Sequence, residues 1–204
     1  MVSLVPLIAW LAAILTAWMA IGRAKPPRTV PLIVDRLLRA VLVFPLGLLS
    51  LWAAFGHIFF PEMAARAIGW QTSPFQFEVG VANLGIGLAA LYAALRGRDA
   101  QIAVGLVAAG FLGGAGVGHI RDIVQAGNLA PGNGGPILFT DFLTPIAIFV
   151  LLYLPRGHQR ARLPYRGNRC PEALDGAVGP TRIKAAAAAK NAAGFGRGLI
   201  QTCV

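Results

Sequence analysis

The run "VLVFPLGLLSLWAAFGHIFF", residues 41–60, decides the fold class, because it is long enough and apolar enough to cross a lipid bilayer as one helix. A spanning helix needs about 20 residues, since each residue rises about 1.5 Å across a hydrocarbon core about 30 Å thick. Pro61 follows the run and cannot continue the hydrogen-bond ladder of a helix. We therefore predict a transmembrane helix that ends at residue 60.

Four further apolar runs lie near residues 2–22, 79–95, 100–118 and 140–154. The chain of 204 residues is 56% hydrophobic and 13% charged, which is too apolar for a soluble domain of this length. No positive charge precedes the first run, as it would in a cleaved signal peptide, so we expect a permanent helix there. The sequence predicts an all-α polytopic membrane domain over residues 1–154, with about five transmembrane helices and a four-helix core of two hairpins.

Lys and Arg are shared unevenly among the connections between these runs. Sixteen of the eighteen lie in the first connection, the third connection and the segment after residue 154, whereas Arg66 and Arg121 lie in the other two. Because basic connections stay in the cytoplasm, this distribution predicts an N-terminus outside and a C-terminus inside. Membrane topology therefore accounts for the net charge of +10. Because no recognised nucleic-acid-binding fold accompanies this charge, we expect no nucleic acid as a partner.

Residues 155–204 change in composition to Arg, Gly, Pro and Ala and include the low-complexity stretch "KAAAAAKNAAGFGRG". We expect this basic tail to be cytoplasmic, mostly disordered and weakly attracted to anionic lipid, because it has few large apolar residues to bury. Cys170 and Cys203 both fall in the tail, where cytoplasmic thiols stay reduced. Their spacing fits neither a zinc site nor a redox pair.

The tripeptide Gly-His-Ile closes two of the predicted spans, around His57 and His119. An acid then opens the next span in each case, since Glu78 lies 21 residues after His57 and Asp141 lies 22 residues after His119. The pattern predicts two helical hairpins built on one plan. If the hairpins pack as parallel repeats, these four side chains lie near the outer interface and can converge.

These side chains admit several interpretations. Two imidazoles and two carboxylates suit zinc, iron or manganese, so the candidate metal ligands are His57, His119, Glu78 and Asp141, although no His-Glu-x-x-His motif is present. His–carboxylate pairs could instead satisfy one another, or form a proton relay or a polar ligand pocket. Glu78 and Asp141 could also be helix-start acids that favour the positive end of the helix dipole.

Three more polar residues complete the set of candidate ligand-binding residues: Asn83, Arg121 and Asp122. Asp122 follows His119 by three residues, on the same face if the helix continues. Asn83 is most simply a residue that hydrogen-bonds to a neighbouring helix. The sequence identifies no cofactor and no catalytic residue.

Small residues predict where helices approach one another. Gly110, Gly114 and Gly118 repeat at four-residue spacing in the fourth span, and Gly85 and Ala89 do so in the third. This pattern lets helix backbones come close in lipid. We expect a packing groove there, and the three glycines of the fourth span could also contact partner membrane helices or a second copy of the chain.

The two outer connections differ in character. Residues 61–76 carry an apolar stripe of Met63, Ala67 and Trp70, which predicts a short interfacial helix with an aromatic anchor. Residues 128–136, "NLAPGNGGP", predict a turn-rich loop, and they lack the Lys-Ser/Thr of a phosphate-binding loop.

The words "SPFQFEVGVANLGIG", "GHIRDI", "NLAPGNGG" and "FTDFLTP" resemble blocks of a group of small, uncharacterised bacterial inner-membrane proteins. The resemblance covers about residues 44–154, and the architecture is more loosely similar to that of DoxX-like four-helix membrane proteins. It implies a helical bundle in the bacterial inner membrane. It implies no activity that could be transferred to individual residues, and the basic tail departs from the pattern.

The first functional hypothesis is a non-enzymatic membrane bundle that binds a small polar ligand, a proton or a metal at its outer end. The alternative is an accessory subunit of a membrane complex, which would use the glycine faces for partner helices. An enzyme acting on a lipid or quinone, with a His–carboxylate pair as general base, is a third hypothesis. It is the weakest of the three, because no nucleophile, cofactor motif or oxyanion arrangement is recognisable.

Overall fold

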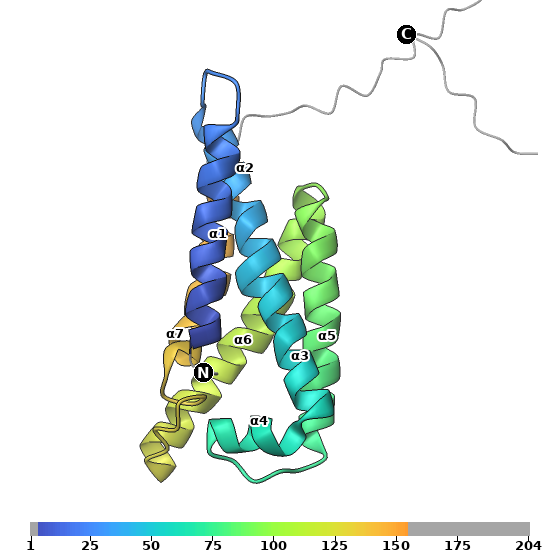
Figure 1. Ribbon diagram of the computed structural model, residues 1–204, viewed down its shortest axis with the longest axis vertical. Coiled ribbons are helices and arrows are strands. Elements are labelled where there is room, and N and C mark those ends of the chain that lie inside the picture. Colours follow the sequence, from blue (N-terminus) through green and yellow to red (C-terminus); the bar gives the residue numbers. More distant parts are fainter. Residues whose placement is uncertain (1–3, 155–204) are drawn as a thin grey trace, which may run out of the picture. The chain divides into compact units, whose positions relative to one another are not determined.

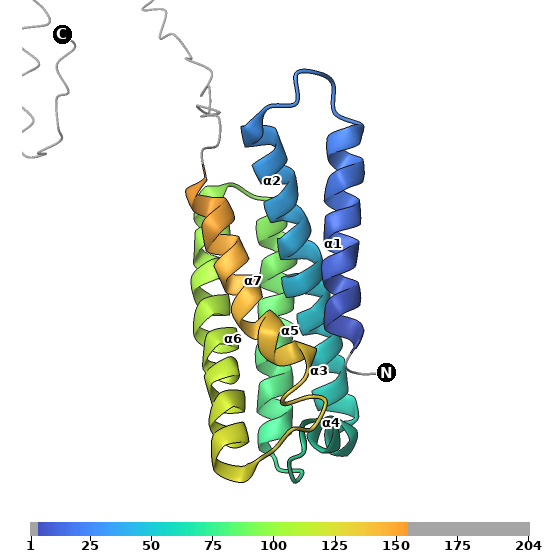
Figure 2. The ribbon, with the colours of Figure 1, turned by 90° about the vertical axis from the view of Figure 1, so that its left-hand side faces the viewer.

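The computed structural model describes residues 4–154, and this part of the chain is helical without any strand. Five helical stretches are long and apolar enough to cross a membrane, which confirms the predicted all-α polytopic fold (Figures 1 and 2). The elements in chain order are α1 (Val5–Gly22), α2 (Val30–Val41), the π-helix η2 (Leu42–Leu48), α3 (Leu49–Phe59), α4 (Pro61–Ile68), α5 (Phe75–Ala94), α6 (Arg98–Ala126) and α7 (Pro136–Tyr153).

Four of the spans are longer than the sequence predicts, α5 and α7 because each begins four residues earlier and the other two by about ten residues. The second begins at Val30, not near residue 41, because α2, η2 and α3 form one continuous helix that ends at Phe59. In α2, charged side chains alternate with buried apolar ones, and this lowers the mean hydropathy of the segment. Hydropathy alone therefore places α2 outside the bilayer. The fourth passes residue 118 and ends at Ala126, where Gly127 adopts a left-handed backbone with φ of 65°. The predicted tail lies outside the described residues.

The helices run alternately up and down, so the connections between them gather at two ends of the bundle (Figure 2). The two ends differ in the residues that their connections carry. The α1–α2 and α5–α6 connections lie at one end, called here the basic end. The end of α3, the helix α4, the start of α5, the end of α6 and the start of α7 lie at the other, called here the histidine end (Figure 1). α6 has 29 residues and is about 43 Å long, so it exceeds the hydrocarbon core and can reach the interface at both ends.

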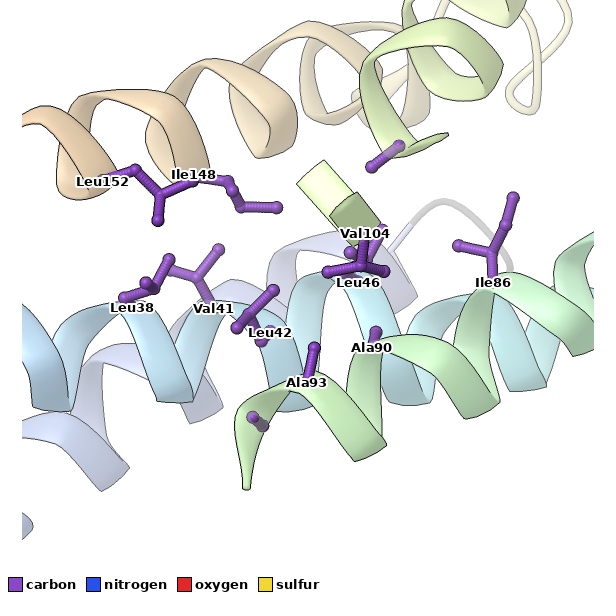
Figure 3. Packing of buried hydrophobic residues seen from close by; sticks show 12 residues of the cluster. Leu38, Val41, Leu42, Leu46, Ile86, Ala90, Ala93, Val104, Ile148 and Leu152 are labelled. Carbon is purple, nitrogen blue, oxygen red and sulfur yellow. The ribbon is translucent and has the colours of Figure 1, made fainter. Parts of the chain in front are cut away.

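The buried core joins four of the spans. The second span contributes a stripe of leucines, α5 contributes alanines, and α6 and α7 contribute branched side chains between them (Figure 3). Large apolar side chains also cover the outer faces of the helices, and Trp18, Leu106 and Phe139 are well exposed. Such an outer surface fits a lipid environment. The labelled core residues are Leu38, Val41, Leu42, Leu46, Ile86, Ala90, Ala93, Val104, Ile148 and Leu152.

A close approach of η2 to α5 depends on glycine. Pro45 lies inside η2 and has no N–H to donate, which accompanies the wider π-helical turn at this place. A Cβ atom at Gly87 would lie 2.8 Å from the Leu51 side chain and 3.0 Å from the Gly47 carbonyl oxygen. The two backbones can therefore approach only because these positions have no side chain.

The glycines predicted to form a groove are not the ones that pack. A Cβ atom at Gly85, Gly110, Gly114 or Gly118 would meet no neighbouring atom of the described chain within 4 Å. The expectation of a groove for helices of this chain is therefore wrong, because four-residue spacing shows which glycines share a face but not which way that face points. The use of these glycines by a partner helix stays a prediction.

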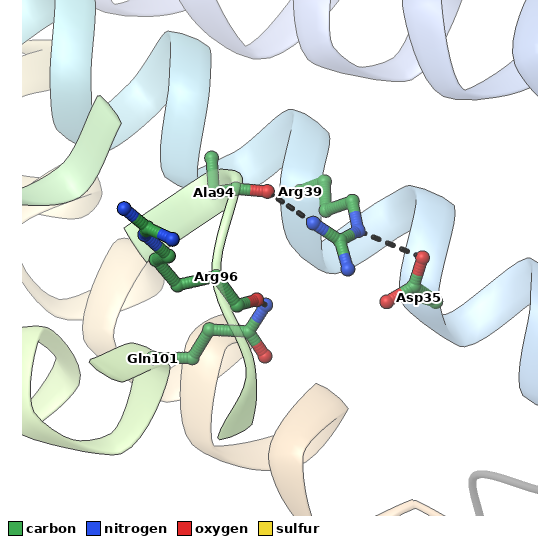
Figure 4. A network of polar contacts seen from close by, with 5 residues as sticks. All are labelled: Asp35, Arg39, Ala94, Arg96 and Gln101. Atoms are coloured by element: carbon green, nitrogen blue, oxygen red, sulfur yellow. Dashed lines mark hydrogen bonds and ion pairs between the residues drawn. The ribbon is translucent and has the colours of Figure 1, made fainter. Parts of the chain in front are cut away.

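Polar contacts at the basic end tie α2 to the end of α5 (Figure 4). Arg39 donates to Asp35 at 2.8 Å and also to the carbonyl oxygen of Ala94. Gln101 of α6 donates to the carbonyl oxygen of Arg96 at 3.2 Å. Carbonyls at a helix C-terminus lack partners within the helix, so Arg39 satisfies the last carbonyl of α5, and Gln101 satisfies a carbonyl of the connection that follows.

Candidate functional site

A buried polar cluster lies at the histidine end, between α6, the loop of residues 127–135 and α7. His119 of α6 is 7% exposed and Asp141 of α7 is 4% exposed. The His119 Nδ1 atom lies 2.6 Å from Asn133 Oδ1, and its Nε2 atom lies 3.6 Å from Asp141 Oδ2. The cluster therefore joins the two helices of one hairpin through the loop between them.

The loop holds Asn133 in a fixed orientation. Asn133 is fully buried, and its Nδ2 donates to the carbonyl oxygen of Asn128 at 2.7 Å. The Gly132 N–H donates to the carbonyl oxygen of Ala67 in α4 at 2.8 Å, and a Cβ atom at Gly132 would lie 2.7 Å from that oxygen. Glycine at this position thus lets the loop lie directly on α4. The next residue, Asn133, then lies beside His119.

The orientation of Asn133 assigns the proton on His119. Because the amide nitrogen of Asn133 is used as a donor, its oxygen is the acceptor, and His119 Nδ1–H must be the donor of the 2.6 Å bond. Nε2 is then left facing the carboxylate of Asp141. An unprotonated Nε2 and an ionised carboxylate would set two lone pairs against each other, so the pair is attractive only when it holds a proton between them.

Asp141 is an internal residue of its helix and not a helix-start acid. α7 begins at Pro136, five residues before Asp141, and the side chain is buried. The preceding residue, Thr140, donates to the carbonyl oxygen of Ile137 at 3.0 Å within the same helix. The simple helix-dipole interpretation of Asp141 is therefore wrong, and burial against His119 replaces it.

Trp70 and Asp122 line the side of the cluster that faces α4. The Trp70 ring stacks on the His119 ring with centroids 6.1 Å apart and an angle of 28° between the planes. Its Nε1 donates to Asp122 Oδ2 at 2.9 Å, and Asn128 Nδ2 donates to the same oxygen at 2.6 Å. The short helix α4 confirms the predicted helical connection, and Trp70, which is 43% exposed, packs on the polar cluster. Its role as an aromatic anchor at the membrane interface stays a prediction.

The other histidine makes a simpler contact. His57 near the end of α3 is half-buried, and its Nδ1 lies 2.6 Å from Oε1 of the buried Gln76. A Cβ atom at Gly80 would lie 3.2 Å from His57 Cβ, so α5 passes close to this turn of α3. His57 thus pairs with an amide on the next span, as His119 does, but the structure places no carboxylate in hydrogen-bonding contact with it among the described residues.

The remaining candidates do not join the cluster. Glu78 is exposed in the first turn of α5 and makes no hydrogen bond or ion pair with the described residues, which fits the helix-start interpretation. Asn83 is buried and donates to the carbonyl oxygen of Val79 in its own helix at 2.9 Å, so the predicted interhelical bond is wrong for this nitrogen. Arg121 is exposed and donates to Gln125 one turn along α6 at 3.1 Å.

The four candidate metal ligands do not converge in the described chain. Nowhere in residues 4–154 do three or more His, Cys, Asp or Glu side chains come together as a possible metal site. His119 and Asp141 form one pair, whereas His57 lies with Gln76 and Glu78 lies on the surface. A tetrahedral site needs more ligands than that pair supplies.

Sequence reasoning missed the amide partners of both histidines. Gln76 and Asn133 are the acceptors, and Asn128 and Trp70 complete the cluster around Asp122. Asn and Gln are frequent in turns and at helix starts for local reasons, so their identity gives no signal of a distant histidine. The one available hint was that each of them precedes the acid of its hairpin.

The residues that build this cluster fall inside a single conserved-domain match. A family model described as a family of unknown function, DUF6790, matches residues 3–161, which is more than half of the chain. The chain belongs to the DUF6790 family. The DUF6790 match includes all five candidate spans, His57 and His119, and it confirms the expected membership of a family without an assigned activity. No curated protein and no solved structure gave a match, and the DoxX-like similarity stays a prediction.

Proposed function

We propose that this protein is an integral membrane protein that binds and exchanges a proton at the buried His119–Asp141 pair. The observation that carries the proposal is the fixed amide of Asn133, which takes the Nδ1–H of His119 and leaves Nε2 facing the carboxylate. A buried imidazole and carboxylate in this arrangement hold one proton between them and can pass it on. The two atoms lie 3.6 Å apart, so a small approach of the side chains brings them within hydrogen-bond distance for the proton to pass.

Among the ligands expected at this end, a proton fits the geometry best. Two hollows of the described surface are lined by residues of α1, α2, α6 and α7, and neither contains a candidate site residue. A proton requires neither a cavity nor the third and fourth ligands that a metal ion would need.

Charge asymmetry supports an orientation for the site. Of the nine Lys and Arg residues in the described chain, seven lie between α1 and η2, between α5 and α6 or at the first residue of α6, toward the basic end, and Arg66 and Arg121 lie at the histidine end. The positive-inside rule then puts the basic end in the cytoplasm of a bacterial inner-membrane protein. His119 lies seven residues before the end of α6, about 10 Å inside it, so the pair would exchange its proton with the outer side.

The proposal is tested by proton uptake. Purified protein in nanodiscs is mixed rapidly with a weakly buffered dye solution, and the protons taken up per chain are measured after each pH jump. We expect Asp141→Asn to lose one proton of uptake, because the amide of Asn can donate to Nε2 without titrating. The matched control Glu78→Gln removes an exposed acid that pairs with no histidine of the described chain, and it should keep the proton uptake of the site. Equal uptake curves for Asp141→Asn and the wild type would overturn the proposal.

A second candidate function, that of an accessory subunit in a membrane complex, rests on the glycine face of α6. Gly110, Gly114 and Gly118 are exposed, and a Cβ atom at any of them would meet open space in the described chain. A partner helix could approach this face closely. The test is co-purification after mild crosslinking: Gly114→Leu should release the partner, and Gly85→Leu on α5, also an open position, should not.

A further inference from the structure

Trp70 occupies a position that the proton-binding pair alone does not explain. It follows the left-handed Gly69 that ends α4, at φ of 83°, and its backbone N–H donates to the carbonyl oxygen of Ala65 at 2.9 Å. Its side chain crosses to α6, where the ring lies on His119 and the Nε1–H meets Asp122. One side chain thus links α4, the proton site and the end of α6.

The position of the Trp70 indole is fixed by the backbone before it and by the side chains around its Nε1 atom. A Cβ atom at Gly69 would lie 2.6 Å from Asn128 Oδ1, so the chain before Trp70 can pass only as glycine. Asn128 itself donates to Asp122 at 2.6 Å and to the carbonyl oxygen of Ile68 at 2.9 Å. Asp122 therefore holds the tryptophan and the loop with the same oxygen, and both are fixed to the helix turn that carries His119.

The charges that face His119 are few. Asp141 faces it from α7 and Asp122 lies one turn along its own helix, while the loop faces it with the neutral Asn133. In α4, Arg66 and Glu62 pair with each other at 3.9 Å and are exposed. The face of an indole attracts a cation, so a proton that makes His119 cationic would strengthen its contact with Trp70, and loss of the proton would weaken it.

We propose that Trp70 is the positioning residue that couples the proton on His119 to the docking of α4 at the histidine end. This inference rests on the proposed proton site and adds a conformational consequence of proton binding. The proton held by His119 and Asp141 determines how tightly α4 and Trp70 pack over these two residues. Asp122 is the fixed anchor of the device, because one of its oxygens accepts both the indole N–H and the Asn128 Nδ2–H.

The test follows the fluorescence of Trp70 across pH. The full chain is prepared with Trp10→Phe, Trp18→Phe and Trp52→Phe, so that Trp70 alone emits, and proton uptake is recorded on the same samples. An imidazolium quenches an indole stacked on it, because it accepts an electron from the excited ring. We expect one pH-dependent step in emission that coincides with the uptake of the site, is lost in His119→Gln, and is unchanged in the matched control His57→Gln.

A second variant separates this inference from the proton site itself. Asp122→Leu removes the anchor but keeps His119 and Asp141, so it should retain proton uptake and lose the emission step. An emission step that survives His119→Gln, or its absence from a protein that takes up the proton normally, would overturn the role of Trp70 and leave the proton site standing. Absence of both uptake and emission step in the parent protein would overturn both proposals.

Discussion

The two histidine hairpins start from the same sequence word and reach different chemistry. In α3–α5 and in α6–α7 alike, the histidine Nδ1 lies 2.6 Å from a side-chain amide oxygen. Among the described residues, a buried carboxylate faces the other nitrogen only in α6–α7, where Asp141 lies two residues further into its helix than Glu78 does in α5. The amide contact is thus the shared structural element, and the depth of the acid decides which hairpin can bind a proton.

The largest difference between the hairpins should appear when each histidine is replaced by leucine. His119→Leu leaves Asp141 and Asn133 buried without their partner, which typically costs about 3 to 5 kcal/mol. His57→Leu leaves only the amide of Gln76 unpaired and should cost about 1 to 3 kcal/mol. Thermal unfolding in one detergent measures both losses of stability. Equal losses would contradict the claim that only the α6–α7 hairpin holds a buried His–carboxylate pair.

A smaller effect is expected from a single methyl group at the helix contacts of each hairpin. A Cβ atom at Gly116 would lie 2.7 Å from the Phe142 ring, and one at Gly80 would lie 2.6 Å from Ile58. Gly116→Ala and Gly80→Ala should each cost about 1 to 3 kcal/mol through overpacking.

The matched controls for these glycines are Gly118→Ala and Gly85→Ala, at positions where a Cβ atom meets open space. Alanine favours a helix over glycine by about 1 kcal/mol, so these variants should be neutral or slightly more stable. A loss of stability in the controls as large as in the contact positions would contradict the packing described for both hairpins.

The smallest effect on stability should come from the acids when each is made neutral. Glu78→Gln changes an exposed group and should stay within about 0.5 kcal/mol of the wild type. Asp141→Asn should cost more than Glu78→Gln at every pH, yet far less than His119→Leu, because its amide can still donate to His119 Nε2. Chemical denaturation of the two variants over a pH series measures the difference in stability. A larger loss in Glu78→Gln than in Asp141→Asn would contradict the burial of Asp141 and the exposure of Glu78.

Hydropathy was enough to predict the spans, because lipid requires runs of apolar residues whatever the packing. It failed at Val30–Val41, where charged side chains hide a helix that continues the second span, and beyond residue 118, where α6 continues past His119. The candidate residues His119 and Asp141 were found because polar side chains within apolar runs are few.

Their environment could not be predicted in the same way. The partners Asn133 and Gln76 come from a loop and a helix start, and only the folded chain brings them to the histidines. The direction in which a glycine face points is likewise fixed by tertiary packing, so Gly105 and Gly116 contact α7 while Gly110, Gly114 and Gly118 do not contact another helix of the described chain.

The most direct test of the proton site is the protonation state of each nitrogen of His119, measured by nitrogen-15 solid-state NMR in lipid bilayers. His57→Gln and His158→Gln leave His119 as the one labelled histidine. The expected result is an Nδ1 that stays protonated throughout the pH series and an Nε2 whose signal follows the proton shared with Asp141, with that change absent in Asp141→Asn. An Nδ1 without a proton, or an Nε2 signal unaffected by Asp141→Asn, would contradict the account.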